Sequence, residues 1–157
     1  MVGGAREITT VTWALTLVLT ALVGCATAKI ATPESDAAAK KFVPPAGKAN
    51  LYVARSGGSY GPTTTFDVVV DGKVAGALSP GTFLLISIDP GTHAVAATSI
   101  GNSSRTSLEA EAGKNYFFEV TASGSGAIVR PSLGFVLLEE MGKLMVRQAK
   151  RVQGSEE

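Results

Sequence analysis

The sequence predicts an all-β protein, a small antiparallel β-sandwich of about seven to eight strands with a C-terminal amphipathic helix. From residue 49 onward, apolar and polar side chains alternate with the period of two that is typical of half-buried strands. Turns that contain glycine or proline recur roughly every eight to twelve residues, as in sandwiches. Beyond residue 138 the apolar spacing becomes helical. These three observations predict the fold class.

The first 24 residues have the composition of a secretion signal. Arg6 and the free amino terminus supply the positive charge, and an apolar run follows from residue 8 to residue 23. This run is short for a membrane span, which needs about 20 apolar residues. Residues 1–24 are therefore predicted to be a signal peptide of an exported protein.

The apolar run ends in Leu22, Val23, Gly24 and Cys25, a pattern that resembles the lipobox of bacterial lipoproteins. The resemblance implies signal cleavage between Gly24 and Cys25, a diacylglyceryl thioether on the Cys25 sulfur, and a further acyl chain such as palmitate on the new amino terminus. Cys25 is the only cysteine, so the chain has no internal disulfide. The alternative is that Cys25 ends an uncleaved transmembrane helix. In a host with two membranes, Ala26 favours the outer membrane, facing the periplasm.

Residues 25–48 are predicted to form a lipidated flexible tether. The segment is rich in Ala, Thr, Lys, Ser and Pro, has few large apolar side chains, and is closed by Pro44 and Pro45. A flexible segment of about 20 residues has a root-mean-square reach of about 25 Å. Such a tether would hold a domain near a lipid bilayer without embedding it. A short helix from Asp36 to Phe42 is the alternative for part of the segment.

The β-sandwich domain is predicted to span residues 49–138. Strands are expected near residues 49–55, 65–71, 73–79, 82–88, 92–99, 105–111, 115–122 and 127–138. Alternate residues of these strands share a face. The predicted core consists of Phe66, Val68, Val70, Leu84, Ile86, Ile88, Leu108, Ala110, Tyr116, Phe118 and Val120.

The turns have a specific chemistry. Asp71-Gly72 between two strand-like runs predicts a two-residue type I′ hairpin, because both central residues of that turn need a positive φ. Proline presets φ at the second position of a type II turn and glycine accepts a positive φ at the third. Two segments carry this pattern, Ser79-Pro80-Gly81-Thr82 and Asp89-Pro90-Gly91-Thr92.

Residues 139–157 are predicted to form a helix followed by a polar tail. Gly142 costs this helix about 1 kcal/mol. The side expected to pack on the sandwich consists of Met141, Leu144, Met145, Ala149 and Val152. A basic stripe, which is either a solvated face or a contact with anionic headgroups or an acidic polymer, consists of Lys143, Arg147, Lys150 and Arg151.

Two stretches of the domain resemble known sequence families. The segment from Val70 to Val95, with its Asp-Gly-Lys and Pro-Gly-Thr-His turns, resembles PEGA-type surface modules. Together with Asn115-Tyr116-Phe117-Phe118 it also resembles the bacterial lipoprotein family called domain of unknown function 2846, over about residues 48 to 140. The resemblance implies a small β-sandwich on a lipid tether, with no established activity and no binding residues to transfer.

The sequence offers no catalytic, metal or cofactor site. His93 is the only histidine, and neither a nucleophile motif nor an acidic partner lies near it in the sequence, as a general base would need. A closed zinc site wants four ligands. His93 is therefore predicted to have a structural role.

These observations predict a non-enzymatic protein of the cell envelope, anchored in the lipid bilayer, whose sandwich binds or scaffolds another envelope protein or polymer. A net charge of +1 without a concentrated basic patch argues against nucleic-acid binding. Two alternatives remain open: an envelope hydrolase that uses His93 as its base, and an inhibitor or immunity-type lipoprotein.

Overall fold

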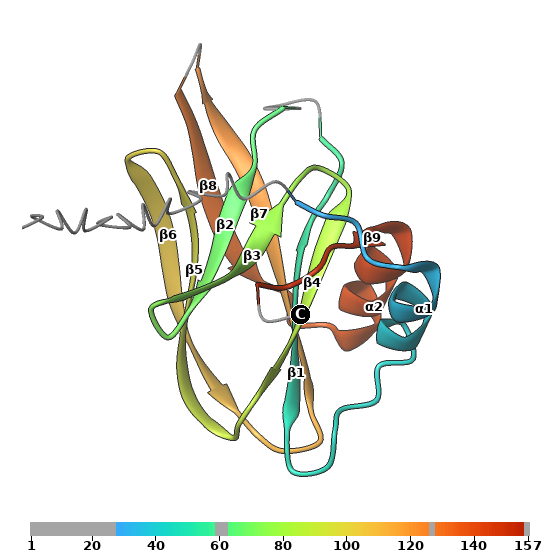
Figure 1. Ribbon diagram of the computed structural model, residues 1–157. Helices are drawn as coiled ribbons and strands as arrows, with labels where there is room; N and C mark the ends of the chain where they lie inside the picture. The colour runs from blue at the N-terminus through green and yellow to red at the C-terminus, as the bar shows by residue number, and fades with distance from the viewer. Residues whose placement is uncertain (1–27, 59–62, 126–127, 156–157) are drawn as a thin grey trace, which may run out of the picture.

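The computed structural model describes residues 28–58, 63–125 and 128–155 (Figure 1). Two β-sheets pack face to face, and two helices, α1 (Pro33–Ala39) and α2 (Glu139–Gln148), lie together on the outer face of one sheet. The predicted all-β sandwich with a C-terminal helix is confirmed. In the part of the chain that the structure describes, no helix is long and apolar enough to cross a membrane. The predicted signal peptide and Cys25 lie outside the described residues.

All eight predicted strands are present, together with a short ninth strand that the sequence did not predict. The first sheet has the order β8-β7-β1-β4-β9 and consists of β1 (Ala49–Arg55), β4 (Thr82–Ile88), β7 (Asn115–Ser125), β8 (Ile128–Phe135) and β9 (Lys150–Arg151). The second has the order β3-β2-β5-β6 and consists of β2 (Phe66–Val70), β3 (Lys73–Leu78), β5 (Gly91–Ser99) and β6 (Asn102–Ala110).

The first sheet is mixed, whereas the sequence predicted antiparallel pairing throughout. Strand β1 is parallel to β7, with Tyr52 opposite Phe117, and β4 is parallel to β9. The remaining pairs, including every pair of the second sheet, are antiparallel. Alternation along one strand records which face is buried, but not the direction of the strand's neighbour. Direction is set by the connections, which here bring β7 back beside β1.

The space between the sheets contains the core that the sequence predicted. Ile86 and Tyr116 are partly buried at its margin, and the other predicted core residues are buried. The hairpin between β2 and β3 is also confirmed, since Val70 pairs with Lys73, and Asp71 and Gly72 have φ values of 50° and 81°. In the turn before β4, Gly81 has a φ of 74°.

The flexible tether predicted for residues 25–48 is wrong from Ala28 onward, and the alternative of a short helix holds, at Pro33–Ala39 instead of Asp36 to Phe42. Thr32 caps α1 by accepting a hydrogen bond from the Ser35 N–H at 3.2 Å. Phe42, just after the helix, is only 8% exposed. It packs on the outer face of the first sheet in a second apolar cluster of Ala39, Phe42, Tyr52, Ala54, Phe83, Phe117, Val146 and Ala149. The aromatic surface on which Phe42 packs is assembled from strands that are distant in the sequence, so the local composition could not reveal it.

Helix α2 is present, but it ends at Gln148 instead of near residue 152, and its predicted buried side is confirmed only in part. Met145 packs against the second apolar cluster, and Ala149 and Val152 are buried just after the helix. Met141 and Leu144 are 55% and 46% exposed, whereas Gly142 and Val146 are buried. Gly142 is the point of closest approach to β7, because it has no side chain to hold the helix away. An apolar pattern does not count glycine as a contact residue, and this explains the error.

After α2 the chain becomes extended and runs along the edge of the first sheet as β9. The Val152 N–H donates to Phe83 O at 2.9 Å, and Val152 also pairs with Ile30 from the other end of the described chain. The chain then crosses to the second sheet, where the Ser155 N–H donates to Ala75 O at 2.9 Å. The last described residues therefore link the edge strands of the two sheets (Figure 1).

Candidate functional site

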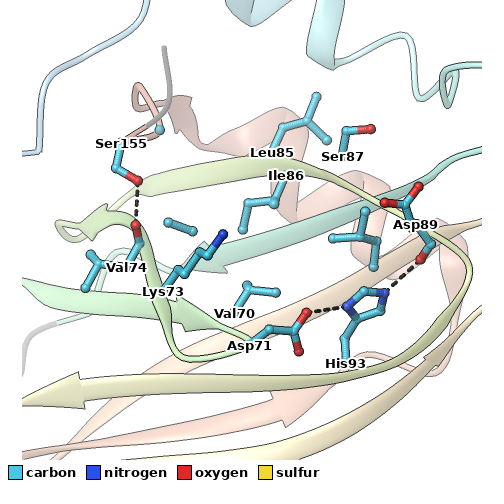
Figure 2. Close-up of a pocket in the computed structure, with 13 residues that line it drawn as sticks. Val70, Asp71, Lys73, Val74, Leu85, Ile86, Ser87, Asp89, His93 and Ser155 are labelled. Carbon is cyan, nitrogen blue, oxygen red and sulfur yellow. Dashed lines mark hydrogen bonds and ion pairs between the residues drawn. The ribbon is translucent and has the colours of Figure 1, made fainter.

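A cleft of about 360 Å³ opens between strand β3 of one sheet and strand β4 of the other (Figure 2). Lys73–Ala75 form one wall and Leu85–Asp89 the other. The apolar part of its lining consists of Val70, Val74, Ala75, Leu85, Ile86 and Ile88. Ligand pockets have volumes of about 300–1,000 Å³ and are mostly apolar with a few polar groups, and this cleft fits that description.

His93 closes one end of the cleft. Its Nδ1–H donates to Asp71 Oδ2 at 2.6 Å, and its Nε2–H donates to the main-chain oxygen of Asp89 at 2.7 Å (Figure 2). The other carboxylate oxygen of Asp71 accepts from the Ala94 N–H at 2.8 Å. The hairpin turn between β2 and β3 is thereby tied to β5 and to the turn before it.

Both ring nitrogens of His93 face acceptors, so the imidazolium, with a proton on each nitrogen, can make both hydrogen bonds at once. The hydrogen bond to Asp71 raises the pKa of His93, and outweighs the opposing effect of partial burial. The same hydrogen bond lowers the pKa of the Asp71 carboxyl. With His93 protonated, the two side chains form an ion pair at this end of the cleft.

The C-terminal segment closes the other end of the cleft. Gly154 and Ser155 line it, and the Ser155 hydroxyl donates to Val74 O (Figure 2). The cleft is therefore bounded by two strands, by the turn at Asp89 and by the end of the described chain.

The charges at the cleft are unevenly satisfied. Asp71 is paired with His93, and Asp89 accepts from the Lys48 ammonium at 2.6 Å. Lys73 lines the cleft, and its side chain extends over it in Figure 2. Among the described residues, Lys73 takes part in none of the ion pairs. Its charge helps to lower the pKa of the Asp71 carboxyl, but Lys73 remains available to pair with an incoming carboxylate.

The sequence reasoning missed the acidic partner of His93. The expectation that none lies near it is wrong, because the pairing of Val70 with Val95 places Asp71 beside Ala94 and His93. The two residues are 22 positions apart, and only the register of β2 against β5 brings them together. The available signal was the Asp-Gly turn, which fixes where the hairpin reverses.

The structure divides the predicted basic stripe. Lys143 pairs with Glu139 at 2.9 Å and Glu140 at 3.0 Å, and these carboxylates raise its pKa. The Arg147 guanidinium lies 5.3 Å from the centre of the Phe42 ring. Lys150 and Arg151 belong to β9 instead of the helix, and the Arg151 N–H donates to the Asp36 carboxylate at 2.8 Å.

No part of the chain that the structure describes holds three or more His, Cys, Asp or Glu side chains arranged for a metal ion. The hydroxyl groups that line the cleft belong to Ser87 and Ser155. Neither hydroxyl is hydrogen-bonded to His93 among the described contacts. The arrangement thus suits the binding of a ligand that offers apolar groups and hydrogen-bonding partners.

Comparison with known families places this fold in one of them. Residues 45–132 match the family described as "Protein of unknown function (DUF2846)". The match covers more than half of the chain and includes both walls of the cleft and the Asp71–His93 pair. Helix α2 and the C-terminal residues that close the cleft lie beyond it. No curated protein matches the sequence. The chain belongs to the DUF2846 family of proteins of unknown function.

Proposed function

We propose that this protein is a lipid-anchored protein of the cell envelope whose β-sandwich is a non-enzymatic binding or scaffolding module, with the cleft between β3 and β4 as its binding site. The observation that carries the binding role is the preformed cleft itself. Its apolar lining is open to a ligand, while both of its ends are held by hydrogen bonds. A preformed site loses little conformational entropy when a ligand binds.

The Asp71–His93 pair is the observation that favours the alternative, a hydrolase with His93 as base, because a carboxylate often orients such a base. The direction of the hydrogen bonds argues against it. A general base must have an unprotonated nitrogen within reach of the proton that it removes. In His93, Nδ1 donates to Asp71 and Nε2 donates to Asp89 O. Binding is therefore the better-supported function.

The anchor follows from the lipobox at Leu22–Cys25, and the fold changes its geometry. Ala28 already packs against the core between the sheets, so only Ala26 and Thr27 separate it from Cys25. Three steps between Cα atoms span at most about 11 Å. A lipid on Cys25 would therefore hold the sandwich directly against the bilayer surface, instead of about 25 Å away on a tether.

Mass spectrometry of the native protein tests the anchor. The amino-terminal peptide should begin at Cys25 and carry the mass of its acyl chains, and a Cys25→Ser protein should leave the membrane fraction while keeping its fold. An unmodified Cys25 in a chain that still begins at Met1 would rule the anchor out.

Site-specific crosslinking in intact cells tests the binding module. A photoreactive amino acid at Ser87, at the exposed rim of the cleft, should capture a reproducible envelope component. The same group at Ser107, exposed on β6 away from the cleft lining, should not.

An activity screen on envelope substrates that compares wild type with His93→Ala tests the hydrolase. If wild type has an activity that disappears in His93→Ala, the protein is a hydrolase and the proposal of a non-enzymatic binding module is wrong.

A further inference from the structure

One side of β4 is an open strand edge. β4 pairs with β1 along its whole length, but with β9 only at Thr82 and Phe83. Phe83 O accepts the Val152 N–H, so the backbone groups of Phe83 point away from β1. Because these directions alternate along a strand, the N–H and C=O groups of Leu85 and Ser87 point to the same side, toward the cleft. Beyond Phe83, none of the described strands pairs with this side.

The same edge already accepts an extended segment of this chain. Residues 150–152 run along the start of β4, and the chain then turns away to β3, where Ser155 is held by Ala75 O. The cleft begins where this segment leaves β4, since Gly154 and Ser155 are part of its lining. The line of β9 continues along Leu85–Asp89, the opposite wall of the cleft.

We propose that the cleft binds an extended segment of a partner protein, which adds as a strand to the open edge of β4. Alternate aliphatic side chains of that segment would point between the sheets, toward Val70 and Ile86. The wall Leu85–Asp89 is five residues long, which at about 3.3 Å per residue accommodates four to five residues of extended chain. Strand addition supplies affinity through main-chain hydrogen bonds and specificity through the pockets for alternate side chains.

The charge and composition of the cleft define this partner further. Lys73 overhangs the cleft, whereas Asp71 and Asp89 are already paired, so the partner segment is expected to carry an acidic residue. None of the 13 lining residues is Phe, Tyr or Trp, and the ring of His93 is already held by two hydrogen bonds at one end of the cleft, so the lining offers little flat surface on which a sugar ring could stack. Within the proposed function, on which this inference rests, the structure thus favours a peptide over a polysaccharide.

A peptide selection on the full-length protein in detergent tests the inference. The library consists of heptapeptides with aliphatic residues at alternate positions and random residues elsewhere. Peptides that bind the immobilised wild type are selected in the presence of soluble Ser87→Pro protein, which removes peptides that bind elsewhere on the surface. Ser87→Ala is the matched control. Ser87→Pro removes a backbone N–H that faces the cleft without removing one that faces β1. We expect enriched peptides to contain Asp or Glu, and to bind wild type and Ser87→Ala alike.

Two measurements on an enriched peptide do not depend on the folding of Ser87→Pro. N-methylation of alternate backbone nitrogens, on the side that faces β4, should weaken binding about tenfold or more, because several main-chain hydrogen bonds are lost. Lys73→Glu should lower the affinity for the acidic peptide severalfold. The same variant should bind more tightly a peptide in which the acidic residue is replaced by lysine. Isothermal titration calorimetry measures both effects.

Several results would overturn strand addition. One is that no peptide is enriched, and another is that the N-methylated peptide binds as tightly as the unmodified one. A third is a homodimer, seen by light scattering, that only Ser87→Pro dissociates; the occupant of the edge would then be a second copy of this chain. If Ser87 still crosslinks an envelope component while every peptide fails, the binding module stands and only the strand addition is wrong. If the crosslink also fails, the proposed function falls with it.

Discussion

Gly142 of α2 lies directly against the ring of Phe117 in β7. A Cβ atom at Gly142 would be 2.3 Å from Cγ and 2.7 Å from Cβ of Phe117. Because the ring's attachment point is involved, a rotation of the ring alone could not relieve the contact. The absence of a side chain at this position allows α2 to cover the outer face of the first sheet.

Gly142→Ala should therefore destabilise the protein, although alanine favours helices by about 1 kcal/mol over glycine. The helix must move away from Phe117, and overpacking of this kind costs about 1–3 kcal/mol. Urea unfolding measures the difference. The matched control is Gly134→Ala in β8, where the added Cβ would meet only Glu119 O at 4.0 Å. Equal stabilities of the Gly142→Ala protein and wild type would contradict the close packing.

The Asp71–His93 pair predicts a stability profile that depends on pH. Folding raises the pKa of His93 from its ordinary 6.5, so its contribution is complete below about pH 6.5 and is lost as pH rises through the raised pKa. Folding lowers the pKa of Asp71 from 3.8, so its contribution is present above about pH 3.8 and is lost as pH falls through the lowered value. The pair should stabilise the fold most between about pH 4 and 6.5.

His93→Gln should accordingly lose about 0.5–1 kcal/mol in that range, a small loss because the Asp71 side chain is half exposed and solvent screens the pair. Its unfolding free energy should approach that of wild type above neutral pH. Glu111→Gln, at an exposed carboxylate outside the cleft, is the control and should show a constant offset. A loss at His93→Gln that is the same from pH 4 to pH 9 would argue against the charged pair.

Tyr52 is predicted to hold α1 on the sheet. Its hydroxyl donates to Ala39 O at 2.8 Å in a fully buried setting, and burial raises the pKa of Tyr52 to about 12. Tyr52→Phe leaves the Ala39 carbonyl without this donor, which should cost about 1–3 kcal/mol and speed hydrogen exchange in α1. Tyr116→Phe removes a hydroxyl that bonds an exposed N–H, that of Glu111, and should cost less. Similar losses for both variants would contradict this role of Tyr52.

Arg55 is a buried cation near the end of β1. Its guanidinium carbon lies 4.4 Å from the centre of the Phe66 ring, and its side chain donates to Thr64 O. A lysine ammonium cannot reproduce both the planar stacking and the donor geometry, so Arg55→Lys should destabilise by about 1–3 kcal/mol. Arg105→Lys on the exposed side of β6 is the control, and thermal unfolding at one pH compares them. If Arg55→Lys left the unfolding temperature unchanged, stacking on Phe66 would contribute little to stability.

The sequence located the strands of the sandwich and the hairpin turn because their signals are local. Alternation marks Phe66, Val68 and Val70 as one buried face whatever lies opposite them. Asp71-Gly72 reports its own need for positive φ, which the structure confirms. The start of α2 was likewise visible from its spacing. Each of these properties depends on a few neighbouring residues, so tertiary context changed little.

Only the tertiary structure shows that the helices cover the outer face of the first sheet and that a cleft opens between β3 and β4. Phe42 became a core residue because Tyr52, Phe83 and Phe117 meet on one sheet face, and Gly142 became a contact because α2 crosses there. Asp71 met His93 through strand register, and the open edge of β4 exists because β9 pairs with only its first two residues. By itself the sequence determined the eight longer strands, the hairpin turn and the start of α2. Which of these elements became neighbours depends on contacts between residues far apart in the chain, and no local pattern records them.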